Sequence, residues 1–386
     1  MLVETSIENL IEEIEKRPAL YKKQLKEYSD INLKKKLWEE VCEVVISDWN
    51  ELGAQEKTKQ EEIVPQYDNE TYFGHFRISR HVSTMIAHLY RNSNYFKNNK
   101  YGQFGQIPAD DQIIIFMWFV GYQIASFRDV ADRFNITLSS LHRIIERVTY
   151  FLSNYSPQII KWPNNEQKRE SEKAFRENGF PMAIGAIDGC HIKIYKPDKD
   201  PDSYINRKGY YSIQMQVVCD HKNKIIDFFA GYPGPVHDSR VFRNSPLCNS
   251  LQAKCGSYFL LGDSGYPLQN NLMTLFKDRG QLTRRQMKYN LKLSQNRYRI
   301  EHCFGILKQK FRQLYHLKFR NIVKIVHFMR ACCVLYNIAL DDNFLELLDE
   351  TPPPTQGVME VMEEEDIVDD YNAKIIRDTI VAEHFI

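Results

Sequence analysis

The chain has 386 residues, of which 43% are hydrophobic and 12% aromatic, so it can bury a sizeable core and has room for two or three domains. This composition excludes a disordered protein, and the eight scattered cysteines, without C-x-x-C spacing, support neither a disulfide framework nor a zinc module. The net charge of +1 combines a strongly basic stretch with a strongly acidic C-terminus.

The N-terminal segment, residues 1–65, is expected to form one or two polar helices with a sparse apolar stripe that includes Leu25 and Trp38. The pattern indicates no chemistry for it. Its first residues are acidic where an export signal needs bases. The longest apolar run, residues 113–120, is too short to cross a bilayer. We therefore expect a soluble, intracellular protein that has no membrane contact.

A helical domain is predicted over residues 66–160, and its second half has the pattern of a helix-turn-helix. Ser126 and Asp129 predict a capping box, Asn135 a left-handed turn residue and Thr137 the cap of the next helix. That helix is expected to bury Leu138, Leu141, Ile145, Val148 and Leu152.

The same helix would leave Arg143 and Arg147 exposed, where they could contact DNA. An ordinary helical hairpin has the same pattern, so DNA contact by this element stays open.

From residue 175 to residue 340 the apolar period changes from 3.6 towards 2, which predicts a second, α/β domain. The expected order is three strands, a helix, a strand, a short fifth strand and a long basic helix opened by a capping box of Thr283 and Gln286. The first five elements are predicted at 181–197, 211–220, 225–234, 239–254 and 257–267, and the fifth strand within 268–277.

Two aspartates stand at the ends of apolar strands. Asp188 follows the run 183–187 and Asp263 follows the run 259–262. A charge in such a buried strand is costly, so each acid needs a partner. If the two strands are neighbours, their carboxylates meet at one edge of the sheet. Taken singly, each aspartate could instead be a strand-end cap or turn residue.

A third acid, Glu301, flanks the buried stripe of the long basic helix. The stripe consists of Ile300, Phe304, Leu307, Phe311 and Leu314. A salt bridge from Glu301 to Arg297, four residues before it, is the alternative to a catalytic role.

Three gathered carboxylates repel by roughly 4 kcal/mol per pair at ~4 Å and an effective dielectric of 20, so one is protonated or a cation binds. Without a Cys/His ligand set, oxygen ligands favour Mg²⁺ or Mn²⁺. Two such ions could activate water and stabilise the leaving oxygen of a phosphodiester. Asp188, Asp263 and Glu301 are therefore candidate catalytic acids and metal ligands.

Two further polar residues lie near these acids in sequence. Asp238 could cap the helix that follows it or contribute a metal ligand, and we keep both readings. His191, three residues past Asp188, points to the opposite face of an extended strand and is expected to be a packed or hydrogen-bonded core residue.

Residues 277–330 contain 15 Lys and Arg against two acids, a net charge of +13, whereas residues 341–386 contain 14 acids against two bases, a net charge of −12. A surface so basic favours a polyanion such as DNA, although a solvated helix face is the alternative. The candidate DNA contacts in it are Arg284, Arg285, Lys288, Arg297, Lys308 and Arg312.

Four segments in this order, AIDGCHIKI (186–194), GYPGPVHDSRVF (231–242), LGDSGYP (261–267) and RYRIEHCFGILKQKF (297–311), resemble the PIF/Harbinger transposases and the host nucleases derived from them, members of the DDE superfamily. The resemblance covers roughly residues 70–340. It implies a ribonuclease H-like mixed sheet flanked by helices, with Asp188, Asp263 and Glu301 as the catalytic acids and Asp238 at a position sometimes treated as a further metal ligand.

The resemblance also implies a separate Myb/SANT-like partner protein that aids DNA binding and nuclear entry. We therefore expect the nucleus as the location, with the cytoplasm as a second one, and leave a homodimer open. The acidic tail, 341–386, departs from the family pattern. It is expected to be a disordered, solvated extension, with partner binding or self-masking as alternatives.

The sequence thus predicts a metal-dependent DNA endonuclease or transposase. A catalytically silent DNA-binding or adaptor protein with the same fold is the main alternative, since the basic region and the helix-turn-helix suffice for that role. A metal-dependent phosphatase on another fold is a third possibility, against which the basic helix around Glu301 argues.

Overall fold

The computed structural model describes residues 67–96, 107–123, 125–278, 280–340 and 369–385, and before them residues 13, 15–20, 33, 36, 37, 40, 41, 44 and 64. The chain divides into two compact units, Met1–Asp68 and Asn69–Ile386. The first unit includes a short 3-10 helix, η1 (Pro18–Leu20), and most of the predicted segment 1–65 lies outside the described residues.

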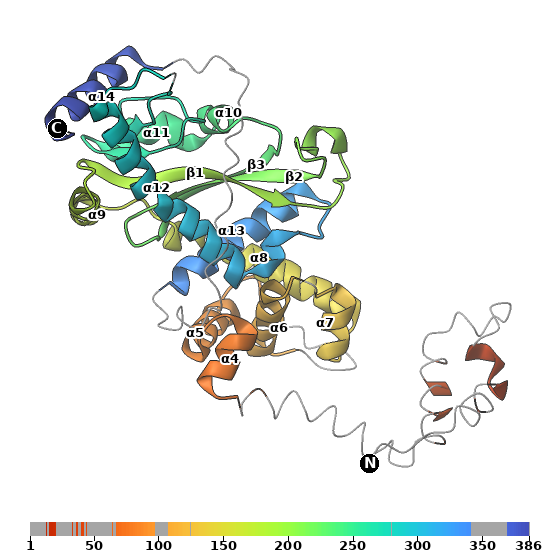
Figure 1. Ribbon diagram of the computed structural model, residues 1–386. Coiled ribbons are helices and arrows are strands. Elements are labelled where there is room, and N and C mark those ends of the chain that lie inside the picture. Colours follow the sequence, from red (N-terminus) through yellow and green to blue (C-terminus); the bar gives the residue numbers. More distant parts are fainter. Residues whose placement is uncertain are drawn as a thin grey trace. The chain divides into compact units, whose positions relative to one another are not determined.

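The helical region contains α4 to α8 and belongs to the same unit as the sheet. Its longest helix, α8, packs along α13, which in turn lies against strand β3. The predicted helical and α/β domains are therefore one compact body, because α8 and α13 bury each other's apolar faces (Figure 1). The helices of this contact region are α4 (Asn69–Phe76), α5 (Arg80–Arg91), α6 (Ala109–Gly121), α7 (Phe127–Arg133), α8 (Leu138–Ile159) and α13 (Ile322–Ile338).

The turn between α7 and α8 has the predicted local structure. Ser126 and Asp129 form a capping box, and the Thr137 side chain caps α8 by accepting from the Ser140 N–H. Asn135 has a φ of +45°, in the left-handed region that asparagine tolerates. The expected burial of Leu138 is wrong: as the first residue of α8 it is 42% exposed, while the later stripe residues are buried.

A five-stranded mixed sheet in the order β3-β2-β1-β4-β5 forms the centre of the larger unit (Figure 1). Neighbours β3, β2 and β1 pair antiparallel, whereas β1–β4 and β4–β5 pair parallel. The predicted mixed sheet flanked by helices is confirmed, including the short fifth strand. The strands are β1 (Ala183–Lys193), β2 (Ser212–Cys219), β3 (Ile225–Pro233), β4 (Phe259–Leu261) and β5 (Leu272–Met273).

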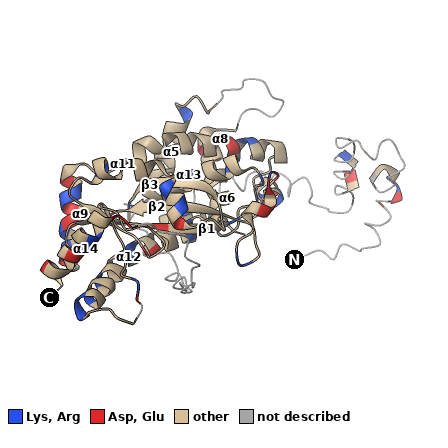
Figure 2. Ribbon diagram, turned by 90° about the horizontal axis from the view of Figure 1, so that it is seen from above, with Lys and Arg blue, Asp and Glu red and all other residues tan. Residues whose placement is uncertain are grey.

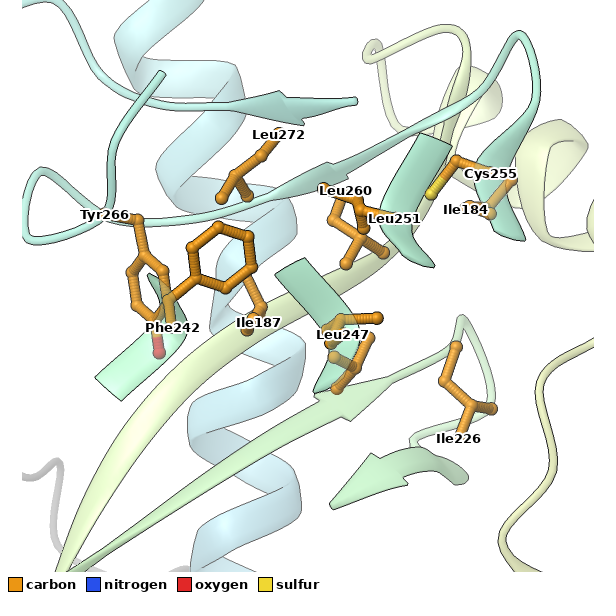
Figure 3. Packing of buried hydrophobic residues seen from close by; sticks show 11 residues of the cluster. Ile184, Ile187, Ile226, Phe242, Leu247, Leu251, Cys255, Leu260, Tyr266 and Leu272 are labelled. Carbon is orange, nitrogen blue, oxygen red and sulfur yellow. The ribbon is translucent and has the colours of Figure 1, made fainter. Parts of the chain in front are cut away.

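The helix predicted over 239–254 is two helices, α10 (Asp238–Arg243) and α11 (Pro246–Cys255). The break follows from Pro246, which stands at the first position of α11 behind the Ser245 cap. Both helices cover one face of the sheet and enclose a buried apolar cluster that includes Phe242, Leu247 and Tyr266 (Figure 3).

On the other side of these strands lies α12 (Arg284–Lys310), a 27-residue helix whose start is fixed by the predicted capping box of Thr283 and Gln286. It crosses the sheet in contact with β1 and β2 (Figure 1). The remaining elements are α9 (Asn165–Glu177), which packs against β1, and the 3-10 helices η3 (Pro201–Tyr204) and η4 (Arg312–Tyr315).

The expectation of a wholly disordered tail is wrong for its last part. Residues Tyr371–His384 form α14, which packs against α12, and Phe385 contacts the rings of Phe180 and Tyr289. Arg377 lies over the Phe276 ring at 3.8 Å. Residues 341–368 lie outside the described residues. Among the described helices, none has both the length and the apolar character needed to cross a membrane.

Candidate metal centre

Asp188 lies on the sixth residue of β1, in the middle of the sheet. Its neighbour Ile187 belongs to the cluster beneath α10 and α11, so alternation along the strand directs Asp188 to the α12 side. One oxygen, Oδ1, accepts from the Gly189 N–H at 2.8 Å. The other, Oδ2, accepts from Arg297 on α12 at 2.9 Å.

Asp263 follows β4 by two residues, and β4 runs parallel to β1 directly beside it. The condition stated from the sequence, that the two aspartate-bearing strands be neighbours, is thus met. The Gly265 N–H donates to Asp263 Oδ1 at 2.9 Å, which fixes the carboxylate in the turn that leaves the strand.

Asp238 completes the group from a third element, since it is the first residue of α10. His237, rather than Asp238, is the N-cap, so the capping alternative for Asp238 does not hold. Ligand oxygens of Asp188, Asp238 and Asp263 all lie within 4.8 Å of one another. The first turn of a helix also favours negative charge, which helps to hold Asp238 there.

The electrostatics of this cluster are unfavourable for three charged acids. Burial raises the pKa of Asp188 to about 6, and the nearby Asp263 charge adds to the rise while Arg297 opposes it. A carboxyl so shifted gains from a nearby cation, because the cation offsets both the lost solvation and the repulsion.

Arg297, on α12, supplies one such positive charge. Its Nη2 lies 2.9 Å from Asp188 Oδ2 and 3.4 Å from Glu301 Oε1. Although burial opposes it, the charges of Asp188, Asp263 and Glu301 raise the pKa of Arg297 above its usual value. The side chain is only 13% exposed and faces the acids, and its contact with DNA stays a prediction.

Glu301 therefore lies on the same side of the sheet as Asp188 but outside the group of three. It is 40% exposed, and the Arg297 nitrogen that pairs with it also pairs with Asp188. The salt bridge to Arg297, considered as the alternative from sequence, forms. It also places the third acid next to the first.

Two uncharged residues show how closely the cluster is fitted. A β-carbon at Gly189 would overlap Asp238 Oδ1, so glycine leaves the room that the Asp238 carboxylate needs beside β1. The buried Tyr266 hydroxyl has no hydrogen-bond partner among the described residues. Burial, then the charges of Asp238, Asp188 and Asp263, raise the Tyr266 pKa well above its usual value. A buried hydroxyl without a partner beside three carboxylates fits a site built for a hydrated cation.

The other predicted DNA contacts fall in three places. Arg284, Arg285 and Lys288 are exposed on the first turns of α12, where Figure 2 shows blue basic segments. Lys308 and Arg312 are half-buried near its C-terminal end, and the Lys308 Nζ donates to the His191 carbonyl at 3.3 Å. Arg143 is exposed and Arg147 half-buried on α8.

His191 is exposed, not a packed core residue. The expectation failed because the end of β1 is less completely covered on that side than its middle. Asp238 was the acid that spacing alone could not place, since a loop and a short helix bring it to the strand ends. Tyr266 was not considered, although its position three residues past Asp263 in LGDSGYP was a usable signal.

Comparison with known proteins matches residues 187–337 to the DDE superfamily endonuclease model. The human protein named "Putative nuclease HARBI1" is 29% identical over 290 residues, covering 72% of this chain and 81% of the relative. Its Bos taurus counterpart is 30% identical with the same coverage. "Protein ALP1-like" of Arabidopsis thaliana is 23% identical over 339 residues, with 81% of each chain covered. No solved structure matches.

The same comparison finds a second match that the sequence patterns missed. Residues 10–70 match a model described as "Alcohol dehydrogenase transcription factor Myb/SANT-like", a DNA-binding family. The apolar stripe with Trp38 was the available signal for it. A segment similar to this Myb/SANT-like family thus precedes the endonuclease domain within one chain.

Proposed function

The chain belongs to the Harbinger transposase-derived nuclease family, with a DDE superfamily endonuclease domain, and from that premise we propose that it is a divalent-metal-dependent DNA endonuclease. The observation that carries the proposal is the gathering of Asp188, Asp238 and Asp263 oxygens within 4.8 Å. The basic surface of α12 and the Myb/SANT-like match support DNA as the substrate.

The donor set fits Mg²⁺ or Mn²⁺, because it consists of carboxylate oxygens from three elements fixed by a sheet and a helix start. Asp188, Asp238 and Asp263 would hold the first ion, and Glu301 would join Asp188 in holding a second. When bound, a pair of such ions supplies Lewis acidity to the phosphodiester and lowers the pKa of an attacking water.

The protein's own groups have distinct roles in this proposal. Arg297 holds Asp188 and Glu301 together by its two ion pairs and so keeps the third acid near the first. Arg284, Arg285 and Lys288 would contact DNA phosphates from the exposed start of α12. Lys308, Arg312, Arg143 and Arg147 would extend that contact.

We also propose that the N-terminal module supplies in the same chain the DNA-binding help that a separate Myb/SANT-like partner would provide. Gel-shift titrations of the full chain, with and without residues 1–68, test this, and equal affinity would contradict it.

A homodimer would show as a doubled mass in light scattering. Nuclear residence is tested by imaging the tagged chain in cells.

The direct test of the activity is nicking of supercoiled plasmid by the full chain with Mg²⁺ or Mn²⁺, and with a chelator as reference. We expect metal-dependent nicking that falls at least a hundredfold in Asp263→Asn. Asp198→Asn, an exposed aspartate outside the cluster, is the matched control and should nick at the wild-type rate. An Asp263→Asn protein as active as wild type would refute the assignment.

A catalytically silent DNA-binding protein remains the second candidate, and one observation favours it. The Arg297 guanidinium already neutralises Asp188 and Glu301, the acids that would have to bind metal. Salt-dependent DNA binding without nicking of any substrate, in wild type and in Arg297→Gln alike, would support this candidate.

A further inference from the structure

A polar cavity lies on the side of α12 away from the acid cluster. It has a volume of about 420 Å³ and is bounded by α12, the C-terminal end of α9 and the turn between β2 and β3. Its lining from α12 includes Lys292, Asn296, Arg299 and His302. The last three follow Lys292 by 4, 7 and 10 residues, so all four side chains share one face of the helix. Arg297 and Glu301 lie about half a turn away around the helix, so α12 separates the cavity from the metal centre.

Two asparagine side chains in the lining leave hydrogen-bond acceptors without partners. Asn296 is only 2% exposed; its Nδ2 donates to the Lys292 carbonyl at 2.9 Å, while its Oδ1 has no partner among the described residues. The Nδ2 of Asn223 lies 3.3 Å from the Nδ1 of His302. The Oδ1 of Asn223 likewise has no partner among the described residues. Both acceptors are closed to water in this structure, so the N–H donors of a ligand in the cavity would meet them once the two side chains turn toward it.

The same cavity has a net positive charge, because Lys292 and Arg299 outnumber the one acid in its lining, Glu177. Within the described part of the chain, neither Lys292 nor Arg299 has a carboxylate ion-pair partner. Arg299 is held in place by donating to the His221 carbonyl at 2.6 Å and by lying over the Phe175 ring at 5.6 Å. A fixed guanidinium with a nearby ammonium is a typical phosphate-binding arrangement.

Flat aromatic surface completes the lining. The rings of Tyr298 and His302 are nearly parallel, with an interplanar angle of 8° and centroids 6.3 Å apart. Tyr298 is 61% exposed, so one face of its ring is available for stacking by a base.

From these three features we propose that the cavity binds a nucleotide unit, with the phosphate at Lys292 and Arg299 and an amino-bearing base at Asn223 and Asn296. The volume falls within the range of small-ligand sites. The unit could be a free nucleotide or a base extruded from a DNA strand; the second source rests on the proposed DNA substrate. Binding needs no metal, so it is measured in chelator, and its failure is distinguishable from failure of nicking.

The experiment is calorimetric titration of the full chain, in chelator, with each deoxynucleoside monophosphate and with inorganic phosphate. Fluorescence anisotropy is measured in parallel on a paired duplex and on one with a single mismatched base. We expect saturable binding of a monophosphate, or tighter binding of the mismatched duplex, with a preference for an amino-bearing base. The first result identifies a free nucleotide and the second an extruded base.

Lys292→Gln and Asn296→Leu should each weaken the preferred ligand at least tenfold, whereas Lys173→Gln, an exposed charge on α9 outside the cavity, should not. Lys292→Gln keeps the test valid if Asn296→Leu fails to fold. Phosphate binding as tightly as any nucleotide, affinities equal in Lys292→Gln and wild type, or no discrimination in either assay would overturn the proposal.

Discussion

Gly189 shows how a single missing side chain can maintain the metal centre. A β-carbon there would meet the Asp238 carboxylate, which must then leave the other two aspartates. We predict that Gly189→Ala weakens Mn²⁺ binding at least tenfold, measured by calorimetry. Gly74→Ala, on α4 where a β-carbon meets nothing within 4 Å, is the control and should bind as wild type. Equal affinity in both variants would mean that Asp238 is not a ligand.

The raised pKa of Asp188 has a consequence for stability in metal-free protein. Its folded-state pKa of about 6 exceeds the ordinary aspartate pKa of 3.8, so its stabilising contribution is complete below about pH 4 and is lost as the pH rises through 6. We therefore expect the free energy of unfolding of wild type, relative to that of Asp188→Asn, to rise by on the order of 2 kcal/mol when the pH falls from 7 to 4. Denaturant titrations in chelator measure this, and a parallel pH dependence of both proteins would contradict it.

Arg297 has an analogous role in balancing charge. Without it, Asp188 and Glu301 lose their shared counter-charge in a largely buried place. Arg297→Gln should lower the melting temperature in chelator and show a larger Mn²⁺-induced rise than wild type, since the cation then replaces the guanidinium. Arg285→Gln, on the exposed start of the same helix, should show neither effect. An unchanged Mn²⁺ response in Arg297→Gln would argue against a metal beside Asp188.

At the scale of elements, local patterns predicted the strands and caps well. The apolar runs before Asp188 and Asp263 became the parallel neighbours β1 and β4, and the Thr283 capping box starts α12. Where a strand or a cap forms depends on residues close in sequence, which is why sequence patterns capture it, whereas the pairing of β1 with β4 joins distant segments.

Long-range geometry set the features that the patterns left open or missed. Asp238 joins the cluster because the connection after β3 returns to the strand ends, and the charge pattern of 341–386 concealed the short apolar stripe of α14. The stripe consists of Ala373, Ile380 and Val381, too few residues to outweigh the acidic surroundings.

The packing of α14 makes a stability prediction. Phe385 is 4% exposed and contacts Phe180 and Tyr289, so Phe385→Ala should lower the free energy of unfolding by about 3 kcal/mol. Tyr371→Ala, whose side chain is 76% exposed at the start of the same helix, should change it by less than about 0.5 kcal/mol. Equal, small effects in urea titrations would mean that α14 does not dock on α12.

In the molecule as a whole, the charge distribution separates the proposed DNA contacts from the proposed metal ligands. The exposed bases at the start of α12 stand apart from the acids that would hold metal. Replacing Arg284, Arg285 and Lys288 by Gln should therefore weaken DNA binding and reduce the slope of log K against log salt by about 3, without altering Mn²⁺ affinity. A slope equal to that of wild type would place the DNA elsewhere.

We infer that three acids far apart in the sequence form one divalent-cation site. Anomalous diffraction from a crystal grown with Mn²⁺, measured at the manganese absorption edge, tests this inference. We expect an anomalous peak in contact with the carboxylates of Asp188, Asp238 and Asp263. Crystals that nick plasmid once dissolved, yet show no manganese at these carboxylates, would contradict it.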